Sequence, residues 1–126
     1  MKEKPVVYLA SPYRGAKAQN EAFARLALAY AIQSGVVPVA PHLLYPQVLK
    51  EHKAKERAMG MELGVSLLKR CDELWLCGNE VSLGMEMERQ EALKAGILVR
   101  KISAEEIYRV FLPDEIHQRE MGGQNV

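Results

Sequence analysis

The sequence predicts an α/β fold in which strands and helices alternate around a small, doubly wound parallel sheet. Short runs rich in β-branched residues recur along the chain, and longer segments with helical spacing of apolar residues separate them. This alternation is typical of βαβ units, whose strands pair in parallel and whose helices cover both faces of the sheet. A length of 126 residues corresponds to one domain. We expect four to five strands in a flavodoxin-like or Rossmann-like sandwich.

The first half of the chain supplies two strands and one long helix. The run PVVYLA, residues 5–10, predicts a buried strand that ends in the turn SPYRG. The next segment has helical spacing, with Asn20 as its N-cap and Gly35 as its stop. Residues 36–40 predict a second, short strand. The segment HLLYPQVLK, residues 42–50, is expected to be a loop with a helical turn.

The second half repeats the alternation. A helical pattern returns over 55–70, and DELWLCG, residues 72–78, predicts a third, buried strand. We expect Asp72, which opens this strand, to bond neighbouring backbone. A helix over 84–95 and a fourth strand over 97–101 follow.

The last predicted element is a helix with a capping box. Ser103 is its cap, and Glu106 lies three residues further on. The helix is expected to run to about Leu112. We therefore expect residues 1–112 to form the domain, and residues 113–126 to be a tail that is mobile unless a neighbouring subunit contacts it.

Composition and charge exclude several classes of function. The formal net charge is +1, so no strong field attracts a nucleic-acid polymer or a membrane surface. The apolar runs are too short to span a bilayer or to act as a signal peptide. We expect a cytoplasmic protein in which Cys71 and Cys77 are reduced thiols. The three histidines lack ligand spacing, so we expect no metal, and the chemistry considered below requires no cofactor.

The helix after the third predicted strand carries three glutamates, Glu86, Glu88 and Glu91. Only Glu88 shares the apolar stripe of Met85 and Ala92 by the 3.6-residue period. It lies about one turn from the helix N-terminus, where the helix dipole favours a negative charge. Such a carboxylate at the edge of a pocket can act as a nucleophile or stabilise a cation. The alternative is a surface glutamate whose stem packs against the core. The pattern alone leaves both open.

Two further regions contain candidate polar site residues. In the turn SPYRG, Arg14 can bind a phosphate as a fork, and Gly15 lets backbone N–H groups approach it. Ser-Pro and Arg-Gly are also ordinary turn chemistry. Tyr8 belongs to the first strand, where core packing is the alternative. His42 follows the second strand and is either a polar site residue or a loop histidine.

Four segments, VYLASPYRG, PHLLYPQVL, LLKRCDELWLCG and SLGMEMERQEA, in this order resemble the nucleoside 2-deoxyribosyltransferase-like superfamily. The best motif is a small-residue loop followed by Gly-x-x-x-Glu-x-x-x-Ala, here Gly84, Glu88 and Ala92. The resemblance runs from about Val6 to Val99. It is strongest to a small, uncharacterised bacterial and phage-type branch, the domain-of-unknown-function group numbered 4406. It implies an α/β sandwich around a five-stranded parallel sheet that acts on the N-glycosidic bond of deoxynucleosides.

The resemblance also implies roles for particular residues. Glu88 matches the catalytic glutamate, and Tyr8 matches the strand tyrosine that orients it. The branch that hydrolyses deoxynucleoside 5′-monophosphates surrounds the phosphate with positions that match Arg14, Gly15, Ser82, Leu83 and Gly84. The base-transferring branch often has an aspartate in place of Ser82, so the sequence favours the monophosphate branch. The residues expected to contact the substrate or its phosphate are Ser11, Arg14, Gly15, His42, Ser82, Gly84 and Met85.

One departure from the pattern keeps a second function open. Both enzyme branches carry an aspartate where this chain has Gly64, and Glu62 lies on a different face of the same helix. The first hypothesis is cleavage, by hydrolysis or base transfer, of the N-glycosidic bond of a deoxynucleoside or its 5′-monophosphate. A different N-glycoside, such as NAD or a ribonucleotide, is a variant of it. The second is a non-catalytic nucleotide-binding sensor that retains the pocket. Both expect a small-molecule nucleoside or nucleotide as ligand.

We also expect a homo-oligomer, at least a dimer. Members of the superfamily complete their sites with a neighbouring subunit. Four methionines on the predicted helices are candidate partner contacts: Met59, Met61, Met85 and Met87.

Overall fold

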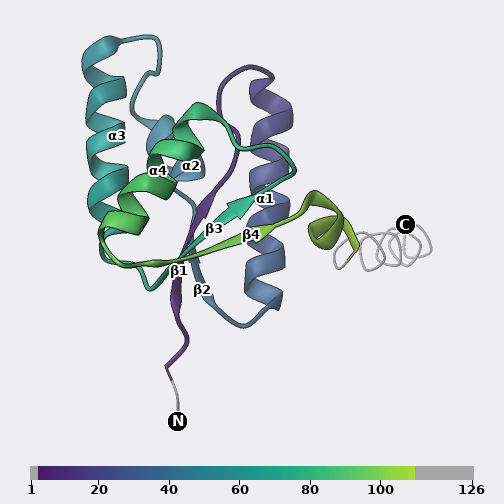
Figure 1. Cartoon of the computed structure of the whole chain (residues 1–126). Helices are drawn as coiled ribbons and strands as arrows, with labels where there is room; N and C mark the ends of the chain where they lie inside the picture. The colour runs from purple at the N-terminus through teal and green to yellow at the C-terminus, as the bar shows by residue number, and fades with distance from the viewer. Residues whose placement is uncertain (1–2, 110–126) are drawn as a thin grey trace, which may run out of the picture.

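The computed structural model describes residues 3–109 and shows a parallel sheet covered by helices (Figure 1). The strands are β1 (Val6–Ala10), β2 (Val37–Val39), β3 (Glu73–Cys77) and β4 (Leu98–Ile102). The helices are α1 (Lys17–Gln33), α2 (Pro41–Leu44), α3 (Ala54–Leu68) and α4 (Leu83–Lys94), with a 3-10 turn, η1 (Tyr45–Gln47). Within the described residues the sheet has four strands in the order β2-β1-β3-β4, all parallel. The predicted fold class is therefore confirmed.

Strand β1 lies in the middle of the sheet and is tied to β3 at its start. Tyr8 pairs with Val39 of β2 on one side and with Leu74 of β3 on the other. The carboxylate of Asp72 accepts the Val6 N–H at 2.8 Å, and the Asp72 N–H donates to the Val6 carbonyl at 2.8 Å. This confirms the prediction that Asp72 bonds neighbouring backbone.

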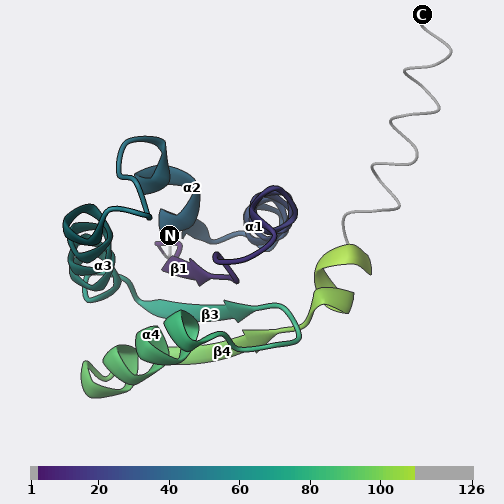
Figure 2. The ribbon, with the colours of Figure 1, turned by 90° about the horizontal axis from the view of Figure 1, so that it is seen from above.

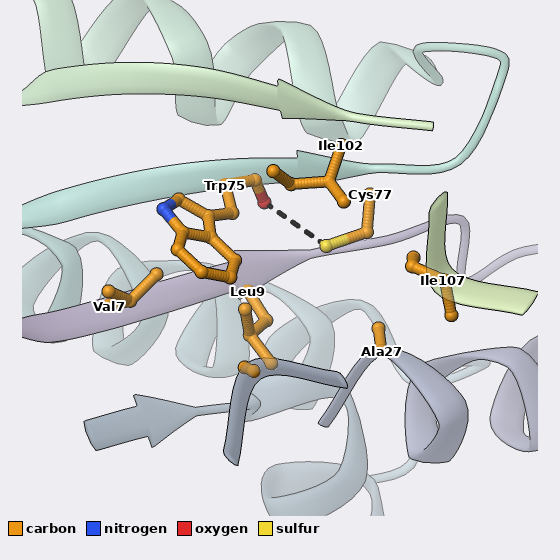
Figure 3. Close-up of a cluster of buried hydrophobic side chains, with 8 residues drawn as sticks. Val7, Leu9, Ala27, Trp75, Cys77, Ile102 and Ile107 are labelled. Atoms are coloured by element: carbon orange, nitrogen blue, oxygen red, sulfur yellow. Dashed lines mark hydrogen bonds between the residues drawn. The ribbon is translucent and has the colours of Figure 1, made fainter. Parts of the chain in front are cut away.

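The sheet has a separate core on each face. Helices α1 and α3 stand on opposite sides of β1 in both views (Figures 1 and 2). On the α1 face, Trp75 packs in a buried cluster with residues of β1, α1 and β4 (Figure 3). On the other face, Tyr8 and Ala10 pack with Leu68 of α3 and Met85 of α4. Because side chains alternate along a strand, Tyr8 enters the layer that contains α3 and α4.

Helix α1 begins earlier than predicted. It starts at Lys17, and Asn20 is not its cap. The Asn20 amide instead donates to the carbonyl of Tyr13 at 3.1 Å and of Arg14 at 2.9 Å. Asn20 therefore fastens the loop between β1 and α1 to the helix. Gly35 follows the helix with a positive φ of 85°, as expected of a stop residue.

Helix α3 turns its glycine face, and not its methionines, toward the sheet. Met59 and Leu63 are 51% and 42% exposed, whereas Gly64 and Leu68 are buried. The reason is Gly64, because the absence of a side chain lets this face of the helix approach Tyr8 closely. Met85 is 1% exposed within the core, so it is not a candidate partner contact.

The capping box at the end of the described chain is confirmed. The Ser103 hydroxyl accepts the Glu106 N–H at 3.1 Å, and the Glu106 carboxylate accepts the Ser103 N–H at 2.9 Å. Residues 104–109 are helical. The predicted helix end at Leu112 and the predicted tail, residues 113–126, lie outside the described residues. None of the helices within residues 3–109 combines the length and apolar character needed to cross a membrane.

Candidate functional site

A cavity of about 600 Å³ opens beyond the carboxyl end of β1. Its walls come from the loop after β1, from α2 and η1, from α3, and from the first turn of α4. In the strand order β2-β1-β3-β4, connections leave β1 and β3 toward opposite edges, so the switch point lies between these two strands. Ligands of open α/β sheets bind at this position. The volume lies in the range that holds small organic ligands.

Glu88 forms the floor of the cavity and is only 6% exposed. It comes from the second turn of α4, on the face that also carries the buried Met85 and Ala92. The Tyr8 hydroxyl donates a hydrogen bond to Glu88 Oε2. Glu88 Oε1 is buried and has no hydrogen-bond partner among the described residues. One carboxylate oxygen is therefore held by Tyr8, while the other has an unused hydrogen-bonding capacity within the described chain.

Burial changes the acidity of this pair. It raises the pKa of Glu88 to about 7, and the hydrogen bond from Tyr8 opposes the rise. Burial and the adjacent carboxylate raise the pKa of Tyr8 well above its usual range. The phenol therefore stays protonated and remains a donor, and a large share of Glu88 is still a carboxylate at neutral pH.

His42 lies beside the same carboxylate. Its Nε2 is 3.9 Å from Glu88 Oε2, is buried, and has no hydrogen-bond partner in the described chain. The ring stacks on Tyr13, with 5.1 Å between centroids. Burial lowers the pKa of His42, and the charge of Glu51 opposes the fall. We therefore regard the imidazole as neutral near pH 7, and the contact with Glu88 as dipolar and not as an ion pair.

Gly64 packs directly against the Tyr8 hydroxyl. A Cβ atom at this position would lie 3.2 Å from Tyr8 Oη, closer than most Cβ contacts in proteins. Glycine inside a helix costs about 1 kcal/mol relative to alanine, so its presence in α3 has a packing reason. Glu62 is exposed and does not line the cavity, in agreement with its predicted position on another face.

At the rim of the cavity, Arg14 is engaged by an unexpected partner. Its Nε donates to Glu51 Oε1 at 2.9 Å, and the two side chains are 70% and 34% exposed. Nothing in the sequence around Glu51 distinguishes it from the other charged residues of that segment. Gly15 adopts a positive φ of 97° in the turn but does not line the cavity. Gly15 therefore lies apart from the predicted site residues that line the cavity.

The first turn of α4 forms another part of the rim. Ser82 is the N-cap, and its Oγ accepts the Met85 N–H at 3.2 Å. Ser82, Gly84 and Met85 line the cavity, so the positive end of the helix dipole opens into it. Ser11, which follows β1, is 4% exposed and lines the cavity as well.

The other two glutamates of α4 lie outside the cavity. Glu86 accepts two hydrogen bonds from the Arg89 guanidinium, at 2.6 and 2.7 Å. Glu91 lies 3.9 Å from the ammonium group of Lys94. Neither lines the cavity, so the helical period correctly separated Glu88 from its neighbours. Within residues 3–109, no three His, Cys, Asp or Glu side chains form a cluster that would hold a metal ion.

Comparison with known proteins supports the fold and the family. The structure is similar to a 2-deoxyribosyltransferase from the psychrotolerant bacterium Bacillus psychrosaccharolyticus, with a TM-score of 0.64. The alignment covers 78% of this chain and 72% of that chain at 17% identity, which shows a common fold. No curated protein matches the chain.

A family model described as Domain of unknown function (DUF7768) matches residues 5–102. It is not the group numbered 4406, so that branch of the superfamily is not supported, whereas the deoxyribosyltransferase-like fold is. The chain belongs to the DUF7768 family.

Proposed function

We propose that this protein cleaves the N-glycosidic bond of a deoxynucleoside or deoxynucleoside 5′-monophosphate, with Glu88 as the nucleophile. One observation carries the proposal: at the floor of a cavity of about 600 Å³, a buried carboxylate has one oxygen held by Tyr8, and its other oxygen has no hydrogen-bond partner among the residues that the structure describes. The deoxyribosyltransferase fold supports the same class of substrate.

In the first step, Glu88 Oε1 attacks the sugar C1′ while the bond from C1′ to the base nitrogen breaks. The bonding electron pair leaves with the base, which takes a proton from solvent. The sugar passes through an oxocarbenium-like state that the carboxylate stabilises, as in retaining glycosidases. The Tyr8 hydroxyl keeps the carboxylate oriented by its bond to Oε2.

In the second step, a water oxygen or the ring nitrogen of a second base attacks C1′. The ester bond to Glu88 breaks, and its electron pair returns to the carboxylate. The attacking group loses its proton to solvent. Attack by water is hydrolysis, and attack by a base is transfer.

The remaining cavity residues are assigned to binding. His42 Nε2 is a buried polar atom without a hydrogen-bond partner in residues 3–109, and we assign it a hydrogen bond to the substrate near C1′. Arg14, Ser82 and the first turn of α4 form the polar rim, where a 5′-phosphate would find a guanidinium and a helix N-terminus. Binding energy from this remote group would hold C1′ against Glu88.

The test measures free base and bound ligand together. The four common 2′-deoxynucleosides and their 5′-monophosphates are incubated with wild type, Glu88→Gln and Glu86→Gln, and released base is quantified by chromatography. Glu88→Gln keeps the shape but cannot attack C1′, so we expect base release to fall by orders of magnitude. The matched control Glu86→Gln removes a glutamate of the same helix outside the cavity and should retain activity. Full activity in Glu88→Gln would contradict the mechanism.

Gly64 favours a second candidate, a nucleotide-binding sensor that keeps the pocket without turnover. The position where the related enzymes carry an aspartate has no side chain here, directly beside Tyr8. If this candidate is correct, the wild type binds a nucleotide but releases no base, and Glu88→Gln changes affinity alone. The same assay therefore separates the two functions.

We also propose that the protein is at least a dimer. Met59 and Met61 on α3 are 51% and 46% exposed, and Leu83 at the rim of the cavity is 93% exposed. Exposed apolar residues of this size are suited to a subunit contact. Light scattering at micromolar concentration should give a mass above 14.2 kDa, and a monomer alone would contradict this proposal.

A further inference from the structure

The ion pair between Arg14 and Glu51 joins two segments across the rim of the cavity. Arg14 belongs to the loop after β1, whose carbonyls at Tyr13 and Arg14 are fastened by Asn20. Glu51 belongs to the turn between η1 and α3. Both residues line the cavity, and the contact from Arg14 Nε to Glu51 Oε1 is 2.9 Å. The guanidinium that best suits an anionic ligand therefore already binds an anionic group of the chain.

The charge of Glu51 also acts on groups inside the cavity. It opposes the lowering by burial of the His42 pKa, and it adds to the effect of burial in raising the pKa of Tyr13. These two rings stack on each other and line the cavity wall. An anionic ligand that binds Arg14 would consequently be repelled by the negative charge of Glu51. It would also compete with Glu51 for the N–H groups of the guanidinium.

We propose that Glu51 is a specificity-determining residue that weakens the preference of the site for a 5′-monophosphate, so that one site accepts the free nucleoside as well. A phosphate at Arg14 has to displace the Glu51 carboxylate or share the guanidinium with it. A nucleoside leaves the ion pair intact. This inference rests on the proposed function, because it assumes a nucleoside in the cavity.

The experiment compares binding of each common 2′-deoxynucleoside with that of its 5′-monophosphate by calorimetry. The quantity of interest is the ratio of the two dissociation constants in wild type, Glu51→Gln, Arg14→Ala and the double variant. Exposed charge pairs couple weakly, so we expect Glu51→Gln to increase the preference for the monophosphate by about three- to fivefold. The increase should disappear in the double variant, because Arg14 is then absent. Glu51→Ala should act in the same direction as Glu51→Gln.

The matched control is Glu86→Gln. Glu86 is also a surface glutamate bonded to an arginine, Arg89, but it lies outside the cavity. This variant should leave the ratio unchanged, and a rise equal to that in Glu51→Gln would overturn the inference by showing an effect of net charge. An unchanged ratio in Glu51→Gln, for every base that binds, would overturn the inference while leaving the proposed function standing. If no nucleoside or nucleotide binds any variant, both the proposed function and the inference fail.

Discussion

Two of the glutamates that line the cavity, Glu88 and Glu51, make polar contacts at different depths. At the floor, Glu88 accepts a hydrogen bond from Tyr8 and is 6% exposed. At the rim, Glu51 binds Arg14, and its side chain is 34% exposed. The floor contact pairs an acid with a neutral hydroxyl in a dry environment, whereas the rim contact pairs two full charges in water.

The difference shows that solvent, more than the partner, decides what each carboxylate can do. At the floor, loss of hydration raises the pKa of Glu88 to about 7, so the group can exchange a proton near neutral pH. At the rim, water and salt screen the charges, so the contact contributes little to stability but can be exchanged for a ligand. The first arrangement suits chemistry and the second suits recognition.

The largest expected effect is on stability, because ionising the buried Glu88 carboxyl group destabilises the folded state. The pKa of Glu88 is about 7 in the folded protein against an ordinary value of 4.5, so the folded state binds this proton more tightly. The stability that this proton contributes is fully present below the pKa of the unfolded chain. It is lost as the pH rises through 7, which lowers the free energy of unfolding by up to about 3 kcal/mol. Glu88→Gln stays neutral, so its free energy of unfolding should exceed that of wild type at pH 8 but match it near pH 4. Urea unfolding at both pH values checks this.

Glu86→Gln provides the control for that experiment. Hydrogen bonds from Arg89 lower the pKa of Glu86, so removing this carboxylate should not stabilise the protein at pH 8. A Glu88→Gln variant that is less stable than wild type at pH 8 would contradict the effect of burial described above.

The second prediction concerns the pH dependence of base release. Only the carboxylate form of Glu88 can attack C1′, and its pKa is about 7. The rate of base release per enzyme molecule should therefore rise with pH up to about 7. Below pH 7 this rate should fall roughly tenfold for each pH unit. Between pH 5 and pH 7 the expected change is about 50-fold. A rate that is flat over this interval would show that Glu88 does not titrate there.

The third prediction sharpens the role of Tyr8. The Tyr8 hydrogen bond lowers the pKa of Glu88, so Tyr8→Phe should move the pH–rate profile to higher pH. The loss of a bond to a charged group should also reduce the free energy of unfolding at pH 8 by about 1–3 kcal/mol. Tyr30→Phe is a matched control, because Tyr30 packs against Trp75 on the other face of the sheet. A Tyr8→Phe profile identical to wild type would exclude Tyr8 as the residue that positions Glu88.

The smallest effect is expected at the rim. Arg14→Ala removes an exposed ion pair, so the free energy of unfolding should change by less than about 1 kcal/mol. Thermal unfolding of Arg14→Ala and Tyr8→Phe side by side tests whether the two ends of the cavity differ as described. A loss of more than about 2 kcal/mol in Arg14→Ala would mean that the rim is also a structural contact.

Local sequence patterns were sufficient to predict the helices and strands and to identify one site residue, Glu88. Apolar runs and helical periods predicted the strands and the long helices. The observed ends of these elements differ from the predicted ends by only a few residues. The same period distinguished Glu88 from Glu86 and Glu91, because the stripe shared with Met85 and Ala92 is a local property of one helix. The capping box at Ser103 is equally local, and it formed as predicted.

Contacts between distant segments were decided by the tertiary structure alone. Asn20 looked like a cap, but the loop after β1 offers it two carbonyls, and the helix begins earlier. The inward face of α3 depends on Gly64, whose small size matters only because Tyr8 lies against it.

Local sequence patterns were enough to predict the fold class, the buried strand that carries Tyr8 and the inward position of Glu88, because these follow from periods repeated within a few turns or strands. The contacts of Glu51 with Arg14 and of His42 with Glu88, in contrast, arise only when the chain has folded. These pairs are 37 and 46 residues apart, as their numbers show, and no local rule relates them. The pKa of Glu88 was decided in the same way, since burial is a property of everything that packs around a group.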